Sequence, residues 1–214
     1  MRALAILGGT FDPVHLGHLR VAWEAATALD AELDLMPASV PPHRPQPVAS
    51  TAQRVAILEA ALRGQSRIGL DLRELARSGP SWTIDTLIEL RGEIGPRRPL
   101  VLLVGADAWA GLAGWHRWRE LFDHAHIGVL TRGGVQAVEP EALAVEVAPR
   151  RTTDRAAIAA APAGCVIDIA VSALEISATR IRALLAAGEE PRWLVPDALL
   201  ADPALLAPYR RVEG

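Results

Sequence analysis

Short apolar runs and amphipathic stretches alternate along most of this chain. The apolar runs are about five residues long and are bounded by glycine, proline or charged residues, which is typical of strands buried on both faces of a parallel sheet. Strands are therefore expected at residues 3–7, 32–36, 67–72, 100–104, 127–130 and 166–169. The amphipathic stretches repeat apolar side chains at helical spacing. They predict helices at residues 15–29, 50–62, 82–94, 118–122 and 177–187, with one or two more from residue 196.

The alternation of strands and helices predicts an α/β fold. We expect a Rossmann-like, doubly wound parallel sheet with helices on both faces and a small C-terminal helical part. Ser50 and Gln53 have the spacing of a capping box at a helix start. Residues 37–47 hold five prolines and predict a loop, whereas the Ala- and Pro-rich residues 133–164 are expected to leave the sheet. No repeat or flexible linker divides the chain, so residues 1–214 are expected to form a single domain.

The composition excludes several classes of site. Basic and acidic residues number 22 and 25, and the net charge of −3 argues against a dedicated nucleic-acid surface. All 22 basic residues are arginines, so neither a lysine Schiff base nor a Walker-type lysine is available. The single cysteine, Cys165, excludes an internal disulfide and a multi-cysteine zinc site. Without a charged leader or an apolar run of about 18 residues, the chain is expected in the cytoplasm and away from membranes.

The loop after the first strand carries the most informative group of residues. Ligands bind at the carboxyl ends of strands in open parallel sheets, and Gly8-Gly9 lets a backbone approach a ligand closely. The helix that follows offers free N–H groups and the positive end of its dipole to an anion. His15 and His18 share one face of its first turn, and Gly17 between them removes a side chain that would crowd a ligand. The pattern favours a polyphosphate site with both imidazoles as donors.

Other interpretations of this loop are weaker. Two histidines three residues apart are often only surface residues, although a preceding strand and glycine loop favour a function. The loop lacks the Gly-Lys-Ser/Thr ending of a Walker motif and the GxGxxG pattern of a dinucleotide site. A metal pair from His15 and His18 remains open, but no cysteine cluster or HExxH motif accompanies it. We therefore predict no protein ligand set for a metal.

Two motifs far apart in the chain resemble those of a known family. GGTFDPVHLGHL at residues 8–19 and ISATRIR at residues 176–182 are similar to the HxGH and ISxTxxR signatures of the nucleotidylyltransferases. Two long motifs in the right order are more specific than either alone. Further segments resemble the bacterial nicotinate-mononucleotide adenylyltransferases: PPHRPQP (41–47), SWTIDTL (81–87), GADAWAGLAGWHRW (105–118) and LVPDALL (194–200). The resemblance covers nearly the whole chain and is weakest over residues 133–164.

The resemblance implies a reaction, its partners and its site residues. Enzymes of that family transfer AMP from ATP to nicotinate mononucleotide, with Mg²⁺ bound to the ATP, and release pyrophosphate and deamido-NAD. The catalytic residues that it implies are His15, His18 and Arg182, in contact with the ATP phosphates. The ATP-binding residues that it implies are Gly8, Gly9, Thr10, Phe11, Asp107, Ser177 and Thr179. A homo-oligomer stays open.

Simpler interpretations compete with these roles. We expect Ser177 to cap the helix that follows, so that its first N–H groups face the outer phosphates of ATP and Arg182 adds a forked cation. Alternatively, Ser177 is only a cap and Arg182 a solvated residue, as we expect for Arg180. The resemblance implies that Asp107 binds the hydroxyls of the ATP ribose. Alternatively, Asp107 is a helix N-cap, which would also explain an aspartate after Gly105-Ala106.

The aromatic residues predict the second substrate site. The resemblance implies that Trp82 and Trp115 wall the nicotinate ring, which suits an indole face by stacking and cation–π attraction. Trp82 stands where the family usually carries tyrosine. Main-chain N–H groups near Thr83 and His116 would bind the nicotinate carboxylate, which favours the acid over the amide.

The remaining candidates have less specific signals. The resemblance implies that His43 and Arg44 approach the phosphates as a lid when their loop closes. The other tryptophans are interpreted as core residues: Trp23, Trp109, Trp118 and Trp193. Trp23 also belongs to the apolar stripe predicted for the first helix, with Leu16, Leu19 and Ala26.

Three competing functions are left open. The same chemistry could act on nicotinamide mononucleotide or on phosphopantetheine, but the latter has no ring for the tryptophans to stack against. A nucleotide-binding protein without catalysis is disfavoured by the intact His15, His18 and Arg182. A nucleic-acid binder is disfavoured by the net charge and predicts a steep salt dependence of heparin binding.

Overall fold

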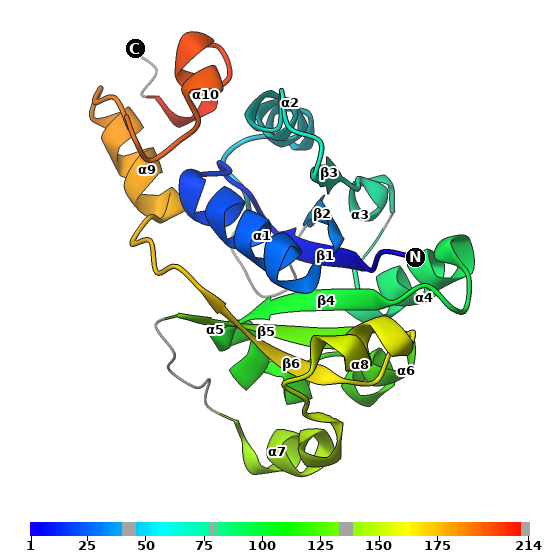
Figure 1. The fold of residues 1–214 in the computed structure, drawn as a ribbon. Helices are drawn as coiled ribbons and strands as arrows, with labels where there is room; N and C mark the ends of the chain where they lie inside the picture. The colour runs from blue at the N-terminus through cyan, green and yellow to red at the C-terminus, as the bar shows by residue number, and fades with distance from the viewer. Residues whose placement is uncertain (40–45, 78, 80, 133–138, 211–214) are drawn as a thin grey trace.

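The computed structural model describes residues 1–39, 46–77, 79, 81–132 and 139–210 and contains the predicted parallel sheet (Figure 1). Six strands in this part of the chain pair in the order β3-β2-β1-β4-β5-β6, and every pair is parallel. This is the doubly wound order. The strands are β1 (Leu4–Gly9), β2 (Glu32–Pro37), β3 (Ile68–Leu70), β4 (Leu100–Gly105), β5 (His126–Arg132) and β6 (Val166–Val171). All six strand predictions are confirmed, with β3 shorter than expected.

Helices connect the strands along the chain. The predicted ones are α1 (Leu16–Leu29), α2 (Thr51–Ala61), α4 (Thr83–Ile94), α6 (Leu121–His124), α9 (Ala178–Ala186) and α10 (Asp197–Ala201). Four further short helices were not predicted: α3 (Arg73–Ala76), α5 (Ala106–Ala110), α7 (Glu141–Val147) and α8 (Arg155–Ala160). Short 3₁₀ turns lie at Leu112–Gly114, Trp118–Glu120, Ala148–Arg150 and Ala207–Tyr209. Within the described ranges, no helix has the length and apolar character needed to cross a bilayer.

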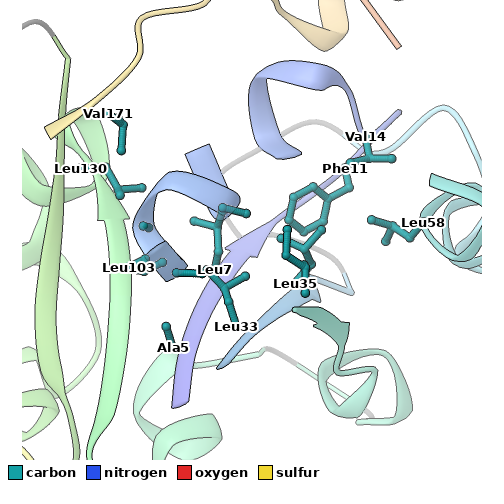
Figure 2. Close-up of a cluster of buried hydrophobic side chains, with 14 of the residues drawn as sticks. Ala5, Leu7, Phe11, Val14, Leu33, Leu35, Leu58, Leu103, Leu130 and Val171 are labelled. Atoms are coloured by element: carbon teal, nitrogen blue, oxygen red, sulfur yellow. The ribbon is translucent and has the colours of Figure 1, made fainter. Parts of the chain in front are cut away.

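Five of the six described strands contribute side chains to two separate cores, one on each face of the sheet, whereas β3 contributes to one of them. In β1, Ala5 and Leu7 belong to the core beneath α1, α2 and α9, whereas Leu4 and Ile6 belong to the core beneath α4 to α7. Figure 2 shows Leu7 grouped with side chains of neighbouring strands in the first of these cores. Because both faces are covered, the central strands β1 and β4 are apolar at successive positions, whereas Asp34 and Asp168 interrupt β2 and β6. The expected helices on both faces are confirmed.

The buried face of α1 differs from the predicted stripe. Ala22, Ala25 and Ala26 are fully buried, whereas Trp23 is 46% exposed and lies 5.8 Å beneath the Arg67 guanidinium. Small alanines let the helix lie close to the sheet, and the bulky indole faces outward. The core assignment is confirmed for Trp109 and Trp118 and is wrong for Trp23 and for Trp193, which is 72% exposed.

The order of the strands reverses direction between β1 and β4. These strands pair in parallel, with Leu7 opposite Leu103. The chain leaves β1 for α1, in the first core, and leaves β4 for α5, in the second core. The connections therefore diverge to opposite faces at the carboxyl ends of β1 and β4, which is where ligands bind in such sheets.

Candidate functional site

The loop after β1 is shaped by Phe11. This residue has a positive φ of 50° and a ring that is only 2% exposed. A Cβ on Gly9 would lie 2.9 Å from the Phe11 ring, so Gly9 is the residue that lets the ring fold back against the strand end. The ring edge contacts the His18 imidazole at 5.1 Å between centroids. The buried Phe11 ring therefore packs against His18 and fixes its position. Gly8, in contrast, is exposed with open space around it.

His15 and His18 form a stacked pair at the start of α1. Their ring centroids are 3.7 Å apart and their planes differ by 22°. His15 is the N-cap of α1, and its Nδ1 accepts a hydrogen bond from the main-chain N–H of His18 at 3.4 Å. Burial lowers the pKa of His15 to about 4, so the ring is neutral near pH 7. Since Nδ1 is the acceptor, the proton is on Nε2, which is a donor for an anion.

Gly17 lies where protein atoms leave little room for a side chain. A Cβ at this position would lie 3.0 Å from Nδ1 of His15 and 3.5 Å from the Cβ of Ile176. Ile176 opens the second motif, so the two motifs pack against each other at Gly17. The expectation that Gly17 avoids crowding a ligand stays a prediction, and its packing against His15 and Ile176 is a second reason for a glycine here.

The N-terminus of α1 has fewer free donors than expected. The N–H of Leu16 donates to the carbonyl of Leu194 at 2.9 Å, and the N–H of His18 is taken by His15. Two of the first three N–H groups of the helix are therefore occupied. An anion bound here would therefore receive hydrogen bonds mainly from the imidazole N–H groups and less from the main-chain N–H groups of the helix.

The second motif reaches the same loop through Arg182. Its Nη1 donates to the main-chain oxygen of Asp12 at 2.7 Å, and its Nη2 donates to Oγ1 of Thr179 at 3.3 Å. The interpretation of Arg182 as a solvated residue is therefore wrong. Ser177 is the predicted N-cap of α9 and accepts a hydrogen bond from the N–H of Arg180 at 3.2 Å. Arg180 itself is exposed, as predicted.

Asp12 is a site residue that the sequence analysis missed. Its carboxylate is 6% exposed and accepts hydrogen bonds from the N–H groups of Val48 and Ala49 at 2.8 and 3.0 Å. These residues directly precede the N-cap of α2, Ser50, where the predicted capping box is present. Asp12 therefore ties the histidine loop to α2. The residue could be mistaken for turn punctuation because it precedes a proline.

Arg54 is a second residue that was missed. It is 1% exposed, and its Nη1 donates to the carbonyls of Thr10 and Ala38 at 2.8 and 2.9 Å. Burial lowers the pKa of this guanidinium from its usual value. Arg54 thus joins the carboxyl ends of β1 and β2. Its burial could have been predicted from the sequence spacing, because Arg54, Ile57 and Leu58 occupy positions i, i+3 and i+4 on the buried face of α2.

Asp107 lies at the second position of α5, directly after β4, and is exposed. The N-cap of α5 is Gly105, without a side-chain cap, so the interpretation of Asp107 as an N-cap is wrong. Its side chain lies at the carboxyl end of β4, and its ribose role stays a prediction.

The start of α4 carries the predicted nicotinate residues. Trp82 is the N-cap position and Thr83 the first residue of the helix. The N–H groups of Thr83 and Ile84 have no acceptor among the residues that the structure describes. The Trp82 ring lies 5.0 Å from the His116 ring, and both Trp82 and Trp115 pack against the second core. The contact between Trp82 and His116 therefore brings the start of α4 next to the Trp115-His116 segment. His43 and Arg44, the predicted lid residues, lie outside the described residues.

Comparisons with known proteins identify the family of this chain. A family model described as cytidylyltransferase-like matches residues 6–184. A nicotinate-nucleotide adenylyltransferase of Halorhodospira halophila is 47% identical over 200 residues, which cover 93% of this chain and 91% of that protein. One of Pseudomonas aeruginosa is 47% identical over 201 residues, which cover 93% of each.

Solved structures of low sequence identity share the fold. The nicotinic acid mononucleotide adenylyltransferase of Plasmodium falciparum, complexed with NaAD, aligns with a TM-score of 0.65 at 15% identity, over 94% of this chain and 96% of that one. A nicotinate-nucleotide adenylyltransferase structure from Vibrio parahaemolyticus aligns with a TM-score of 0.63 at 18% identity, over 96% and 99%. With the family model and the relatives of 47% identity, the matches cover both motifs. The chain therefore belongs to the cytidylyltransferase-like family and, within it, to the nicotinate-nucleotide adenylyltransferases.

Proposed function

We propose that this protein transfers the adenylyl group of ATP to nicotinate mononucleotide, which yields deamido-NAD and pyrophosphate in NAD biosynthesis. One observation carries the proposal most directly: the Arg182 guanidinium is hydrogen-bonded to the loop that carries His15 and His18. Donors from both motifs can therefore contact one triphosphate. The relatives of 47% identity specify which nucleotides are joined.

The reaction needs donors and alignment more than it needs a base. The nucleophile is the 5′-phosphate of nicotinate mononucleotide, which is already an anion. One of its oxygens attacks the α-phosphorus of ATP in line, and the bond from that phosphorus to the bridging oxygen of pyrophosphate breaks. We assign the N–H donors of His15 and His18 and the guanidinium of Arg182 to the phosphates, where negative charge accumulates on the leaving group. Because His15 is neutral, it acts as a hydrogen-bond donor and not as a permanent cation.

Mg²⁺ fits this site as a companion of ATP. Over the described ranges, no three His, Cys, Asp or Glu side chains are grouped so that they could hold a metal ion. Mg²⁺ binds through phosphate oxygens and water with few protein ligands, so the triphosphate would supply most of its ligands. When bound, the ion neutralises charge on the phosphates.

Gly17→Ala is expected to lower kcat about tenfold, because the new methyl group would press on the His15 ring, which already stacks on His18. Gly92→Ala in α4 is the matched control, since a Cβ there meets nothing within 4 Å and adds up to about 1 kcal/mol of helix propensity. Steady-state kinetics and thermal unfolding of both variants test this. A Gly17→Ala enzyme with the wild-type kcat would show that the ring has room to move.

The acceptor is tested by a pyrophosphate-release assay with ATP and a panel of phosphorylated acceptors. The start of α4 offers N–H donors beside Trp82, and an amide NH₂ would face these donors without an acceptor. We therefore expect kcat/KM for nicotinate mononucleotide to exceed that for nicotinamide mononucleotide by at least about tenfold. Phosphopantetheine should give no turnover. Equal values for the acid and the amide would contradict the carboxylate site, and binding of ATP without any turnover would favour a binding protein.

A further inference from the structure

The C-terminal segment, residues 196–210, places a buried hydroxyl against the histidine loop. Tyr209 ends the 3₁₀ turn Ala207–Tyr209 and is 4% exposed. Its hydroxyl donates to Oδ1 of Asp12 at 2.9 Å, across 197 positions of the sequence. Asp12 therefore receives three hydrogen bonds on its carboxylate, two from the N–H groups before α2 and one from Tyr209.

The same segment packs between the elements that flank the site. Figure 1 shows α10 between α2 and α9, and Leu199 of α10 shares the first core with Leu58 of α2 and Ile181 of α9. The main-chain oxygen of Asp12 accepts the hydrogen bond from Arg182, whose Nη1 is also 3.9 Å from the Asp12 carboxylate. Asp12 is thus the point at which α2, α9 and the C-terminal turn meet the loop.

We infer that Asp12 and Tyr209 are positioning residues for adenylyl transfer, and that they hold the Arg182 guanidinium in place relative to the histidine pair. This inference rests on the proposed function. The Tyr209 hydroxyl is one of three donors that orient the carboxylate. Without it, the carboxylate can turn toward Arg182 and draw the guanidinium from the phosphates. An in-line transfer is sensitive to such displacements of its donors.

Tyr209→Phe tests the inference, because it removes only the hydroxyl and keeps the ring in the core. We expect kcat to fall about tenfold while the KM for nicotinate mononucleotide changes less than about twofold, since the displaced group acts on the leaving phosphates. Thr131→Val is the matched control. It removes another buried hydroxyl, which donates to the carbonyl of Ile169 at 3.4 Å within the sheet. This variant should keep the wild-type kcat even if it is less stable.

A double mutant of Tyr209 and Asp12 distinguishes a positioning role of the hydroxyl from a general loss of stability. If the hydroxyl acts through the carboxylate, Tyr209→Phe should have little further effect on kcat in an Asp12→Asn background. Multiplicative effects would contradict the inference. A Tyr209→Phe enzyme with kcat within twofold of wild type would overturn it, and so would a Thr131→Val enzyme with the same loss of kcat. Should Tyr209→Phe not fold, Asp12→Asn is compared with Thr131→Val. A much lower kcat in Asp12→Asn supports the inference, and equal values of kcat overturn it.

The contact can also be read by spectroscopy, independently of turnover. Tyr209 is the only tyrosine of the chain, so phenolate absorbance reports on it alone. Burial and the Asp12 carboxylate raise the pKa of Tyr209, and Arg182 and Arg54 oppose them with smaller effects. The phenolate of the folded protein should therefore appear well above the usual pH of about 10, and at lower pH in Asp12→Asn. Identical titrations of wild type and Asp12→Asn would contradict the contact. Turnover of the wild type with the acceptor panel tests the proposed function separately.

Discussion

His18→Ala is expected to lower kcat by a hundredfold or more, which corresponds to the loss of one donor that acts in the transition state. The His18 ring stacks on His15 at 3.7 Å and meets the edge of Phe11. Its position is therefore fixed before a nucleotide binds, so little binding energy is needed to orient it. Alanine removes the imidazole donor and also the ring on which His15 stacks.

The measurement is kcat for pyrophosphate release at saturating ATP and nicotinate mononucleotide. His124→Ala is a suitable control, because it deletes a histidine of the short helix α6 but keeps the carbonyl of residue 124 that accepts the hydrogen bonds of Arg91. The control should turn over at the wild-type rate. A His18→Ala enzyme at a near-normal rate would leave only nucleotide binding for this loop.

The strands and their order along the chain could be predicted because each is a short apolar run with clear ends. Leu100–Gly105, for example, is bounded by Pro99 and ends in a glycine. Some of the short helices were missed, because α3 and α5 have four and five residues and fit less than two turns of any periodic pattern. Trp23 was misassigned because hydrophobicity alone does not show whether small alanines or a large indole face the sheet.

The donors of the site could be found from sequence, but the residues that position them could not. His15, His18 and Arg182 lie in motifs with recognisable residue types and spacing. Asp12 and Arg54 act through main-chain groups of distant segments, such as Val48 and Ala38, and a sequence shows no such contacts. The occupied N–H of Leu16 is a similar case, because its partner, Leu194, lies near the other end of the chain.

Arg182→Ala is expected to lower kcat about a hundredfold, whereas Arg180→Ala should leave it unchanged. Both arginines lie in the first turns of α9, but the Arg180 side chain is exposed while Arg182 is bound to the histidine loop. Hydrogen bonds to Asp12 and Thr179 use two N–H groups of the Arg182 guanidinium. An arginine has five such groups, so the others remain for phosphate oxygens.

Arg182→Lys separates the charge of the residue from its geometry. Lysine keeps the positive charge but has a single ammonium group, which cannot hold the loop and a phosphate with the same fork of donors. We therefore expect kcat for Arg182→Lys to lie between those of Arg182→Ala and wild type, about tenfold below wild type. If lysine restores the full rate, charge alone is sufficient and the bond to Asp12 does not contribute to catalysis. If Arg180→Ala lowers kcat as much as Arg182→Ala does, the assignment of the anion site within α9 is wrong.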